Sequence, residues 1–163
     1  PLPQGEIGVL EVRGPNVFAG YWKMPDKTAE ELRDNGFFIT GDLGRIDADG
    51  YVHIVGRGKD LIISGGYNIY PKEIELVIDD LPGVVECAVI GVPHKDFGEA
   101  VVAVIVAQDG VEISAKDVSN MIKDNLARFK QPTSIEFVQA RPRNAMGKVQ
   151  KNVLREAYDG VFQ

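Results

Sequence analysis

A short segment rich in glycine and charge, Gly56 to Asp60, divides the 163-residue chain into two unlike halves. Before it, short runs of β-branched and aromatic residues are separated by turn residues; after it, helical patterns alternate with apolar runs. The glycines that flank Arg57 allow backbone angles that other residues avoid and let the backbone approach a ligand closely. The segment is therefore interpreted as a hinge or a ligand-binding loop, with a plain charged linker as the alternative.

The first half, residues 1–56, is predicted to be β-rich. Three of its aromatic residues, Phe18, Tyr21 and Trp22, are expected to pack within this unit, with stacking on a ligand as the alternative. The expected elements are, in order, a strand over residues 5–13, a short helix over 26–32, a strand over 37–40 that stops at Gly41-Asp42, and a strand over 51–55.

The turn at residues 47–50 reads Asp-Ala-Asp-Gly, a spelling shared with calcium-binding loops. A calcium loop would need its last glutamate where this chain has Gly56, so a hairpin turn is the better interpretation. His53, in the strand that follows, has no metal partners in the pattern and is expected to be a half-exposed strand residue. The sequence therefore predicts no metal site.

The second half alternates helices with apolar strands. Pro71 fits the first turn of a helix, and Ser114 with Asp117 forms a weak capping box at the start of another. The expected elements are a helix over residues 71–81, strands over 84–92 and 99–107, a helix from 114, a strand over 134–138 and a last helix over 150–158. The nearly continuous apolar strands favour a sheet covered by helices, so the predicted fold class is α+β with a mainly antiparallel sheet.

Size, charge and cysteine content narrow the functional classes. The length suits one ordinary domain or two small ones, and the formal net charge of −6 argues against a nucleic-acid surface. The longest apolar run, residues 100–107, is far shorter than the ~20 residues that a transmembrane helix needs. Cys87 is expected to be a buried structural residue, and a single cysteine suits a reducing, cytoplasmic location. The start at Pro1, without a methionine, is typical of a fragment or an excised domain.

The sequence contains no nucleophile triad and no zinc-ligand spacing. Gly147-Lys148 resembles the end of a phosphate-binding loop, but Pro142 and Val149 break that pattern. The remaining candidates are charged residues beside glycines: Asp42, Arg57, Lys59 and Lys148. A lysine at the tip of a glycine-containing loop can bring positive charge to an anionic substrate, whereas a solvated surface lysine is the plainer interpretation of Lys148 alone.

Four motifs, taken together, favour the chemical interpretation. They are Thr40-Gly41-Asp42, Gly56-Arg57-Gly58-Lys59-Asp60, the glycine-rich segment 65–75 that ends in Pro-Lys-Glu-Ile-Glu, and Pro142 followed by Gly147-Lys148 and Lys151. In this order and spacing they resemble the adenylate-forming superfamily, which includes acyl-CoA synthetases, firefly luciferase and the adenylation domains of peptide synthetases. The resemblance covers essentially the whole chain. Its closing segment, residues 143–154, is most similar in style to malonyl-CoA synthetases.

The resemblance implies an acid–CoA ligase. Such an enzyme activates a carboxylate, here a fatty acid or a malonate-type acid, with ATP and Mg²⁺ to an acyl-AMP and then transfers the acyl group to CoA. A small C-terminal domain would rotate between the two steps. On this basis residues 1–56 would be the end of the large N-terminal domain, residues 57–60 the hinge, and residues 61–163 the mobile C-terminal domain.

The roles of individual residues follow from the same resemblance. Lys148 would bridge the substrate carboxylate and the α-phosphate, Asp42 would hold the ribose hydroxyls, and Arg57 would contact the ribose or a phosphate. Lys59 and Asp60 would form the hinge. The residues that would contact CoA and its pantetheine arm are Gly65, Gly66, Tyr67, Phe129 and Lys130. Some relatives carry further basic residues after this Phe-Lys pair, where the chain has Gln131 and Thr133.

The phosphate loop and the acyl pocket would lie in the large N-terminal domain, outside this chain. The expected partners are therefore a small carboxylate, ATP, CoA and that missing domain, with no cofactor tightly bound and no activity from the chain alone. Two alternatives stay open at this point. One is the adenylation module of a peptide synthetase, which would load a carrier-protein thiol, and the other is a non-catalytic α+β interaction domain.

Overall fold

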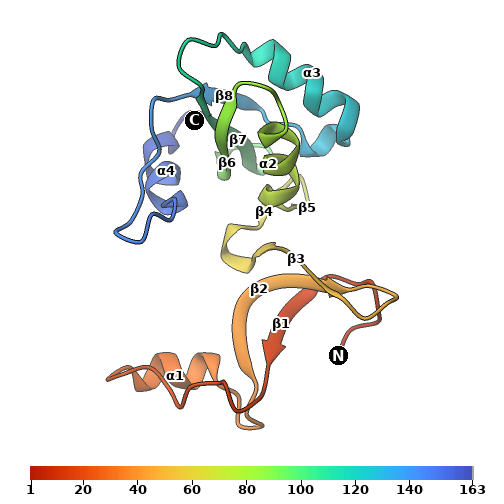
Figure 1. The fold of residues 1–163 in the computed structure, drawn as a ribbon, viewed down its shortest axis with the longest axis vertical. Helices are drawn as coiled ribbons and strands as arrows, with labels where there is room; N and C mark the ends of the chain where they lie inside the picture. Colours follow the sequence, from red (N-terminus) through yellow and green to blue (C-terminus); the bar gives the residue numbers. More distant parts are fainter. Residues whose placement is uncertain (163) are drawn as a thin grey trace. The chain divides into compact units, whose positions relative to one another are not determined.

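The computed structural model describes residues 1–162, which form two compact units. Unit 1 is Pro1–Lys59, and unit 2 begins at Asp60. Each unit has a β-sheet of its own, as the red to yellow and the green to blue parts of Figure 1 show.

Unit 1 is an antiparallel sheet of three strands in the order β1-β2-β3, accompanied by one helix (Figure 1). Its elements are β1 (Gly8–Val12), α1 (Pro25–Glu31), β2 (Phe38–Ile46) and β3 (Val52–Arg57), followed by the 3-10 turn η1 (Gly58–Asp60). The predicted hairpin turn joins β2 to β3. Its Asp47 carboxylate accepts the backbone N–H groups of Asp49 and Tyr51 at 3.0 and 2.9 Å, and the side chain of His53 lies beside it, half exposed.

The prediction that the strand ends at Gly41-Asp42 is wrong, because β2 continues to Ile46. The register between β1 and β2 shifts at this point. Val9 pairs with Leu43 and Glu11 pairs with Ile39, so the segment of β2 between the two pairs is longer than the segment of β1 that it faces. Within this stretch Gly41 has a φ of +75°, which glycine adopts without steric cost. The strand therefore passes through a bulge where an end was expected.

The aromatic cluster of unit 1 forms only in part. Phe18 packs edge-on against Tyr21 and Phe38, with ring centroids 4.9 and 5.2 Å apart. Trp22, by contrast, is 86% exposed, so its predicted packing role is wrong within this unit. It lies in the turn before α1, and the ammonium of Lys23 is 5.8 Å from its ring centroid.

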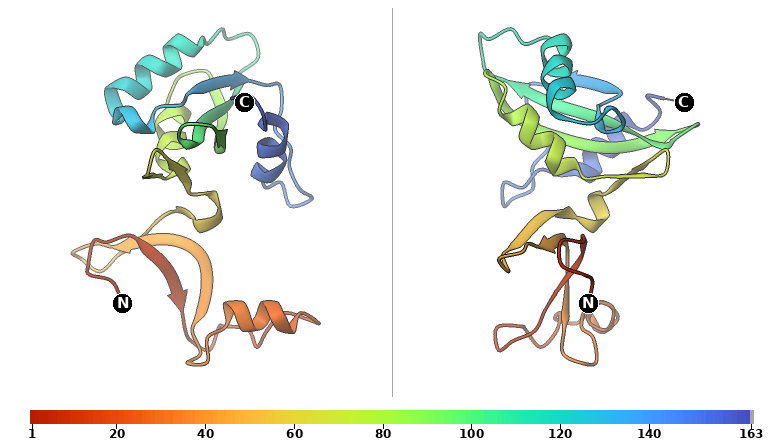
Figure 2. Two further views of the ribbon diagram at one scale, coloured as in Figure 1. Left: turned by 180° about the vertical axis from the view of Figure 1, so that it is seen from behind. Right: turned by 90° about the vertical axis from the view of Figure 1, so that its right-hand side faces the viewer.

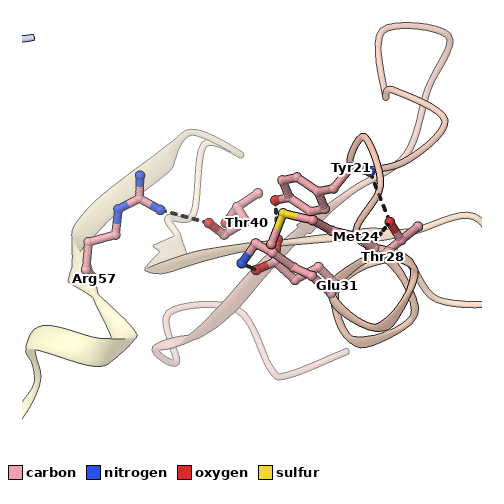
Figure 3. Close-up of polar contacts among 7 residues, drawn as sticks. Tyr21, Met24, Thr28, Glu31, Thr40 and Arg57 are labelled. Atoms are coloured by element: carbon pink, nitrogen blue, oxygen red, sulfur yellow. Dashed lines mark hydrogen bonds and ion pairs between the residues drawn. The ribbon is translucent and has the colours of Figure 1, made fainter.

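The start of α1 is tied to this cluster by hydrogen bonds (Figure 3). The Thr28 hydroxyl accepts the Tyr21 backbone N–H at 3.0 Å and donates to the Met24 carbonyl at 2.8 Å. The Tyr21 hydroxyl donates to Glu31. These bonds connect the helix to the turn that precedes it.

Unit 2 is a five-stranded sheet with helices on both faces (Figures 1 and 2). Four strands follow the order β5-β4-β7-β6, and β8 pairs in parallel with β7. The elements are β4 (Ile62–Ser64), β5 (Tyr67–Ile69), α2 (Pro71–Asp79), β6 (Val84–His94), β7 (Gly98–Ala107), α3 (Ala115–Asn125), η2 (Arg128–Lys130), β8 (Ser134–Phe137) and α4 (Lys151–Tyr158). The predicted α+β class and the predicted order from α2 onward are confirmed.

The paired strands β6 and β7 contribute side chains to the core on both faces of the sheet, because successive residues of each strand point to opposite faces. On one face the buried residues pack with α2 and α3: Ile62, Ile69, Ile74, Ile78, Cys87, Val89, Val101, Ala103, Ile105, Val118 and Ile122. On the other face a smaller set packs with α4: Ala88, Ile90, Val92, Val102, Val104 and Leu154. Cys87 is buried as predicted, and this burial raises the pKa of its thiol far above the usual range.

Local signals at the helix ends also match the structure. Pro71 occupies the first turn of α2, and the Ser114 hydroxyl with the Asp117 carboxylate forms a complete capping box at α3. α3 ends at Asn125, and the separate 3-10 turn η2 follows it.

Candidate functional site

In unit 1, Asp42 and Arg57 lie opposite each other on β2 and β3. The Arg57 Nε is 3.0 Å from Asp42 Oδ1. The Arg57 Nη1 donates to the Thr40 carbonyl at 2.8 Å, as Figure 3 shows. The Thr40 hydroxyl accepts the Asp42 N–H at 3.1 Å and donates to the Leu10 carbonyl at 2.9 Å. The bulge in β2 thus places a carboxylate and a guanidinium side by side, with the Asp42 side chain 24% exposed and that of Arg57 50% exposed.

The boundary between the units falls within η1, between Lys59 and Asp60. Asp60 is fastened to unit 2, since its Oδ1 lies 2.6 Å from the Arg155 guanidinium on α4. Lys59 is exposed. The structure therefore separates the two predicted hinge residues, one anchored to a helix and the other at the junction itself.

In unit 2, three of the residues assigned to CoA line a single open groove of about 660 Å³. They are Gly65, Tyr67 and Phe129, and the rings of the latter two stack with centroids 4.5 Å apart. The other lining residues are Ser64, Phe97, Arg128, Gln131 and Thr133. The groove thus combines an aromatic wall with hydroxyl, amide and guanidinium groups.

The other two assigned residues, Gly66 and Lys130, are not among those that line the groove. The Lys130 ammonium lies 2.6 Å from Glu73 of α2, an ion pair that was not predicted. Its charge is therefore already paired, although it also lies 5.7 Å from the centroid of the Phe129 ring.

The hairpin that carries Gly65 is held to the start of β7. The Gly65 N–H donates to the Phe97 carbonyl at 2.9 Å, and the Ile63 N–H donates to Glu99 Oε2 at 2.7 Å. At the tip, Gly65 and Gly66 have φ values of +56° and +83°, which suit a two-residue hairpin turn. Glu99 thus supports the groove without lining it.

Lys148 lies at the C-terminal end of a tight loop that is closed by the backbone and side chain of Asn144. The Asn144 Oδ1 accepts the N–H groups of Met146 and Lys148 at 3.0 and 2.9 Å, and its backbone N–H donates to the Lys148 carbonyl at 2.9 Å. Gly147 has a φ of +76°. The Lys148 side chain is exposed, so the loop presents an ammonium group to solvent.

Two arginines connect this loop to Glu86 on β6. Arg141, whose side chain is 5% exposed, donates through Nε to Glu86 Oε1 at 3.0 Å and places Nη2 2.5 Å from Oε2. Arg143 also contacts Glu86 Oε2 and donates to the Gly147 carbonyl at 2.5 Å. The hydrogen bonds from Arg141, reinforced by Arg143, hold the pKa of the Glu86 carboxyl below its usual range against the opposing effect of burial.

On the other side of the loop, Lys151 begins α4 and is also anchored. Its ammonium lies 2.6 Å from Glu75 Oε1, and the same oxygen accepts the Val89 N–H of β6 at 2.9 Å. Glu75 comes from α2, so one carboxylate joins two helices to the edge strand of the sheet.

Sequence reasoning did not single out Glu86, Arg141, Arg143 or Glu99. One signal was available for Glu86, since it is the only charged residue in the apolar run from Val84 to Ile90. A carboxylate at such a position needs a cation partner.

Two further properties concern the described residues 1–162. They contain no group of three or more His, Cys, Asp or Glu side chains arranged to hold a metal ion. No helix in this part of the chain is long and apolar enough to cross a membrane.

Comparison with known proteins connects this geometry to a family. The family described as "AMP-binding enzyme C-terminal domain" matches residues 73–148, which end at the exposed lysine of the loop. Feruloyl-CoA synthase from Amycolatopsis sp is 47% identical over 158 residues, which are 97% of this chain and 32% of that protein. Long-chain-fatty-acid–CoA ligase FadD13 from Mycobacterium tuberculosis is 46% identical over 94% of the chain and 30% of its own length.

The solved structures agree with the sequence comparison. ATP-bound MatB from Rhodopseudomonas palustris is 62% identical, with a TM-score of 0.92 over 99% of this chain and 32% of that protein. Apo MatB from the same organism gives a TM-score of 0.73 at the same identity. The chain therefore spans about a third of the length of its relatives, and it belongs to the adenylate-forming superfamily, of which it carries the AMP-binding enzyme C-terminal domain.

Proposed function

We propose that this chain is the C-terminal portion of an acid–CoA ligase that works in two steps. In the first, a carboxylate oxygen attacks the α-phosphorus of ATP, and pyrophosphate leaves. In the second, the CoA thiol loses its proton and attacks the acyl carbonyl, and AMP leaves. The observation that carries the proposal is the exposed Lys148 on a closed loop at the end of the matched family region.

Lys148 is assigned to the first step. Negative charge accumulates on the phosphoryl oxygens as the α-phosphorus is attacked, and an ammonium group stabilises that charge. The exposed side chain supports this role, because it is available to reach a substrate beyond its own loop.

Asp42 and Arg57 are assigned to the nucleotide. A carboxylate can accept hydrogen bonds from both hydroxyls of a ribose, and a guanidinium beside it can donate to the ribose or to a phosphate. Their ion pair of 3.0 Å supports the assignment, since it orients the carboxylate before any ligand binds.

The groove beside Tyr67 and Phe129 is assigned to the pantetheine arm of CoA, with Arg128 as a candidate contact for its phosphates. Lys59 is assigned as the hinge between the two steps, and residues 57–60 remain the proposed hinge segment. The ATP-bound and apo forms of MatB support a conformational difference, because one sequence matches this chain with TM-scores of 0.92 and 0.73. Mg²⁺ would accompany ATP as its counter-ion in the first step.

The acid is proposed to be a malonate-type or fatty acid. The style of segment 143–154 and the 62% identity to MatB support the former. Feruloyl-CoA synthase and FadD13, which are named for other acids, are 47% and 46% identical over almost the whole chain, so the choice of acid is left to the experiment.

The test uses the full-length protein that carries this chain. AMP release from ATP would be measured with malonate, ferulate and a long-chain fatty acid, each with CoA, with a carrier protein, or with neither. We expect CoA-dependent turnover of one acid, loss of adenylation in Lys148→Ala, and unchanged thioester formation by that variant from pre-made acyl-AMP. Normal adenylation by Lys148→Ala refutes the assignment, and transfer to the carrier protein in preference to CoA would instead support the peptide-synthetase alternative.

A further inference from the structure

The peptide group between Gly147 and Lys148 is fixed at both of its polar ends. Its carbonyl accepts a hydrogen bond from Arg143 at 2.5 Å, and its N–H donates to Asn144 Oδ1 at 2.9 Å. A peptide group is planar, so two bonds of opposite direction fix its orientation and the direction in which the next Cα lies. The backbone that carries the Lys148 side chain is therefore oriented before any substrate arrives.

The guanidinium of Arg143, which binds the Gly147 carbonyl, is itself fixed by an ion pair with Glu86. It contacts Glu86 Oε2, the oxygen that Arg141 also approaches at 2.5 Å. Glu86 belongs to β6, which is paired with β7 from Val84 to His94, so the anchor belongs to the sheet and not to the loop. A relay of side chains thus runs from the sheet through Arg143 to the peptide of Lys148.

We propose that Glu86 and Arg143 are positioning residues for Lys148 that act specifically in the adenylation step. The inference rests on the proposed function of Lys148 and adds the residues that set its direction. A group that acts on a transition state must be held close to its productive geometry, and a displacement of about 1 Å can reduce a rate about a hundredfold. Arg143, 44% exposed at its side chain, is in position to supply this constraint without being part of the core.

A role of Arg143 in positioning Lys148 can be distinguished by experiment from a role in stabilising the fold. If Arg143 acts through Lys148, its substitution slows adenylation but leaves thioester formation from pre-made acyl-AMP unchanged. Its effect also disappears once Lys148 has been replaced, because residues that act as one unit are not additive.

The experiment compares Arg143→Met, Glu86→Gln, Lys148→Ala and the double variant Arg143→Met/Lys148→Ala in the full-length protein. Arg33→Met serves as the matched control, because Arg33 is also a half-exposed arginine paired with a glutamate, Glu11 of unit 1. We expect adenylation to fall about tenfold or more in Arg143→Met and Glu86→Gln, with thioester formation within about twofold of wild type. The control is expected to match wild type in both steps.

The outcomes are distinguishable. Equal losses in both half-reactions, accompanied by a lower melting temperature, overturn the proposal in favour of a structural role for the relay. Normal adenylation in Arg143→Met with strongly impaired Lys148→Ala overturns it while leaving the proposed function intact. Normal adenylation in Lys148→Ala overturns the proposed function itself. A double variant that is slower than Lys148→Ala alone shows that Arg143 acts other than through the lysine, which also overturns the proposal.

Discussion

Replacing Glu75 with alanine should strongly destabilise unit 2, because this carboxylate is buried and holds two partners. One oxygen of this carboxylate accepts both the Lys151 ammonium and the Val89 N–H, and the Glu75 and Lys151 side chains are only 10% and 19% exposed. Removal leaves a backbone donor beside a fully buried valine without its acceptor, at a cost of about 1–3 kcal/mol. It also leaves an ammonium without its counter-charge, and losing one partner of a buried pair costs about 3–5 kcal/mol.

The two costs overlap, and Lys151 can turn its flexible stem toward water, so we expect a loss of about 3 kcal/mol for Glu75→Ala. Glu75→Gln keeps an acceptor for Val89 and for the ammonium, so its expected loss is about 1 kcal/mol. Combining Glu75→Gln with Lys151→Met removes both charges together. The double variant should therefore lose less than the sum of the two single losses, by about 1 kcal/mol or more.

The measurement is urea unfolding of the 163-residue chain, followed by far-ultraviolet circular dichroism. Helices α2, α3 and α4 all belong to unit 2 and dominate that signal, whereas the single tryptophan, Trp22, is in unit 1 and already exposed. A loss below about 1 kcal/mol in Glu75→Ala, or strict additivity in the double variant, would refute the reasoning, because either result means that the carboxylate does not couple the two helices to the sheet.

Three further outcomes are expected. Ile90→Ala, at a fully buried position packed with α4, should cost about 2–5 kcal/mol in urea unfolding, while Ile63→Ala, at a half-exposed position, should cost far less. Ser114→Ala should lower the free energy of unfolding by about 1 kcal/mol, because it removes the capping box of α3. Faster amide hydrogen exchange in α3 would show this loss. Because its Arg141 bonds lower the pKa of Glu86, the stability that this carboxylate contributes is present above its unfolded pKa and is lost as pH falls through the lowered folded pKa. Unfolding curves of wild type and Glu86→Gln should therefore differ at neutral pH and converge in acid, and a constant difference down to low pH would contradict the assignment.

Most of unit 2 could be predicted from local sequence signals. Ile74 and Ile78 repeat at helical spacing behind Pro71, and both are fully buried on α2. Short β4 and β5 were not predicted, although the Gly65-Gly66 pair between them is a recognised hairpin signal. With only three residues in each strand, periodicity carried too little information to distinguish a hairpin from a ligand loop.

In the candidate site, too, the local features could be predicted from the sequence and the long-range contacts could not. The loop and its exposed lysine, Lys148, were expected from glycine and proline placement. The contact of Arg143 with Glu86 joins residues 57 positions apart in the chain, and no local pattern specifies such a partner. Trp22 was expected to pack within unit 1 but is exposed, because the presence of an aromatic residue in a sequence does not show whether other residues of the same unit cover its ring.

The Glu75 carboxylate, which joins α2 to β6, also affects whether a second molecule can add a strand to the edge of the sheet. β6 is the outermost strand on one side of its sheet, and an outer strand with free N–H groups is a template on which a strand from another molecule can add. Near the middle of this eleven-residue strand, the Val89 N–H already donates to Glu75. At the opposite margin lie β5, with three residues, and β8, with four, and both offer little length for pairing. A carboxylate of the protein itself thus occupies one of the N–H groups that an added strand would need at the long edge of the sheet.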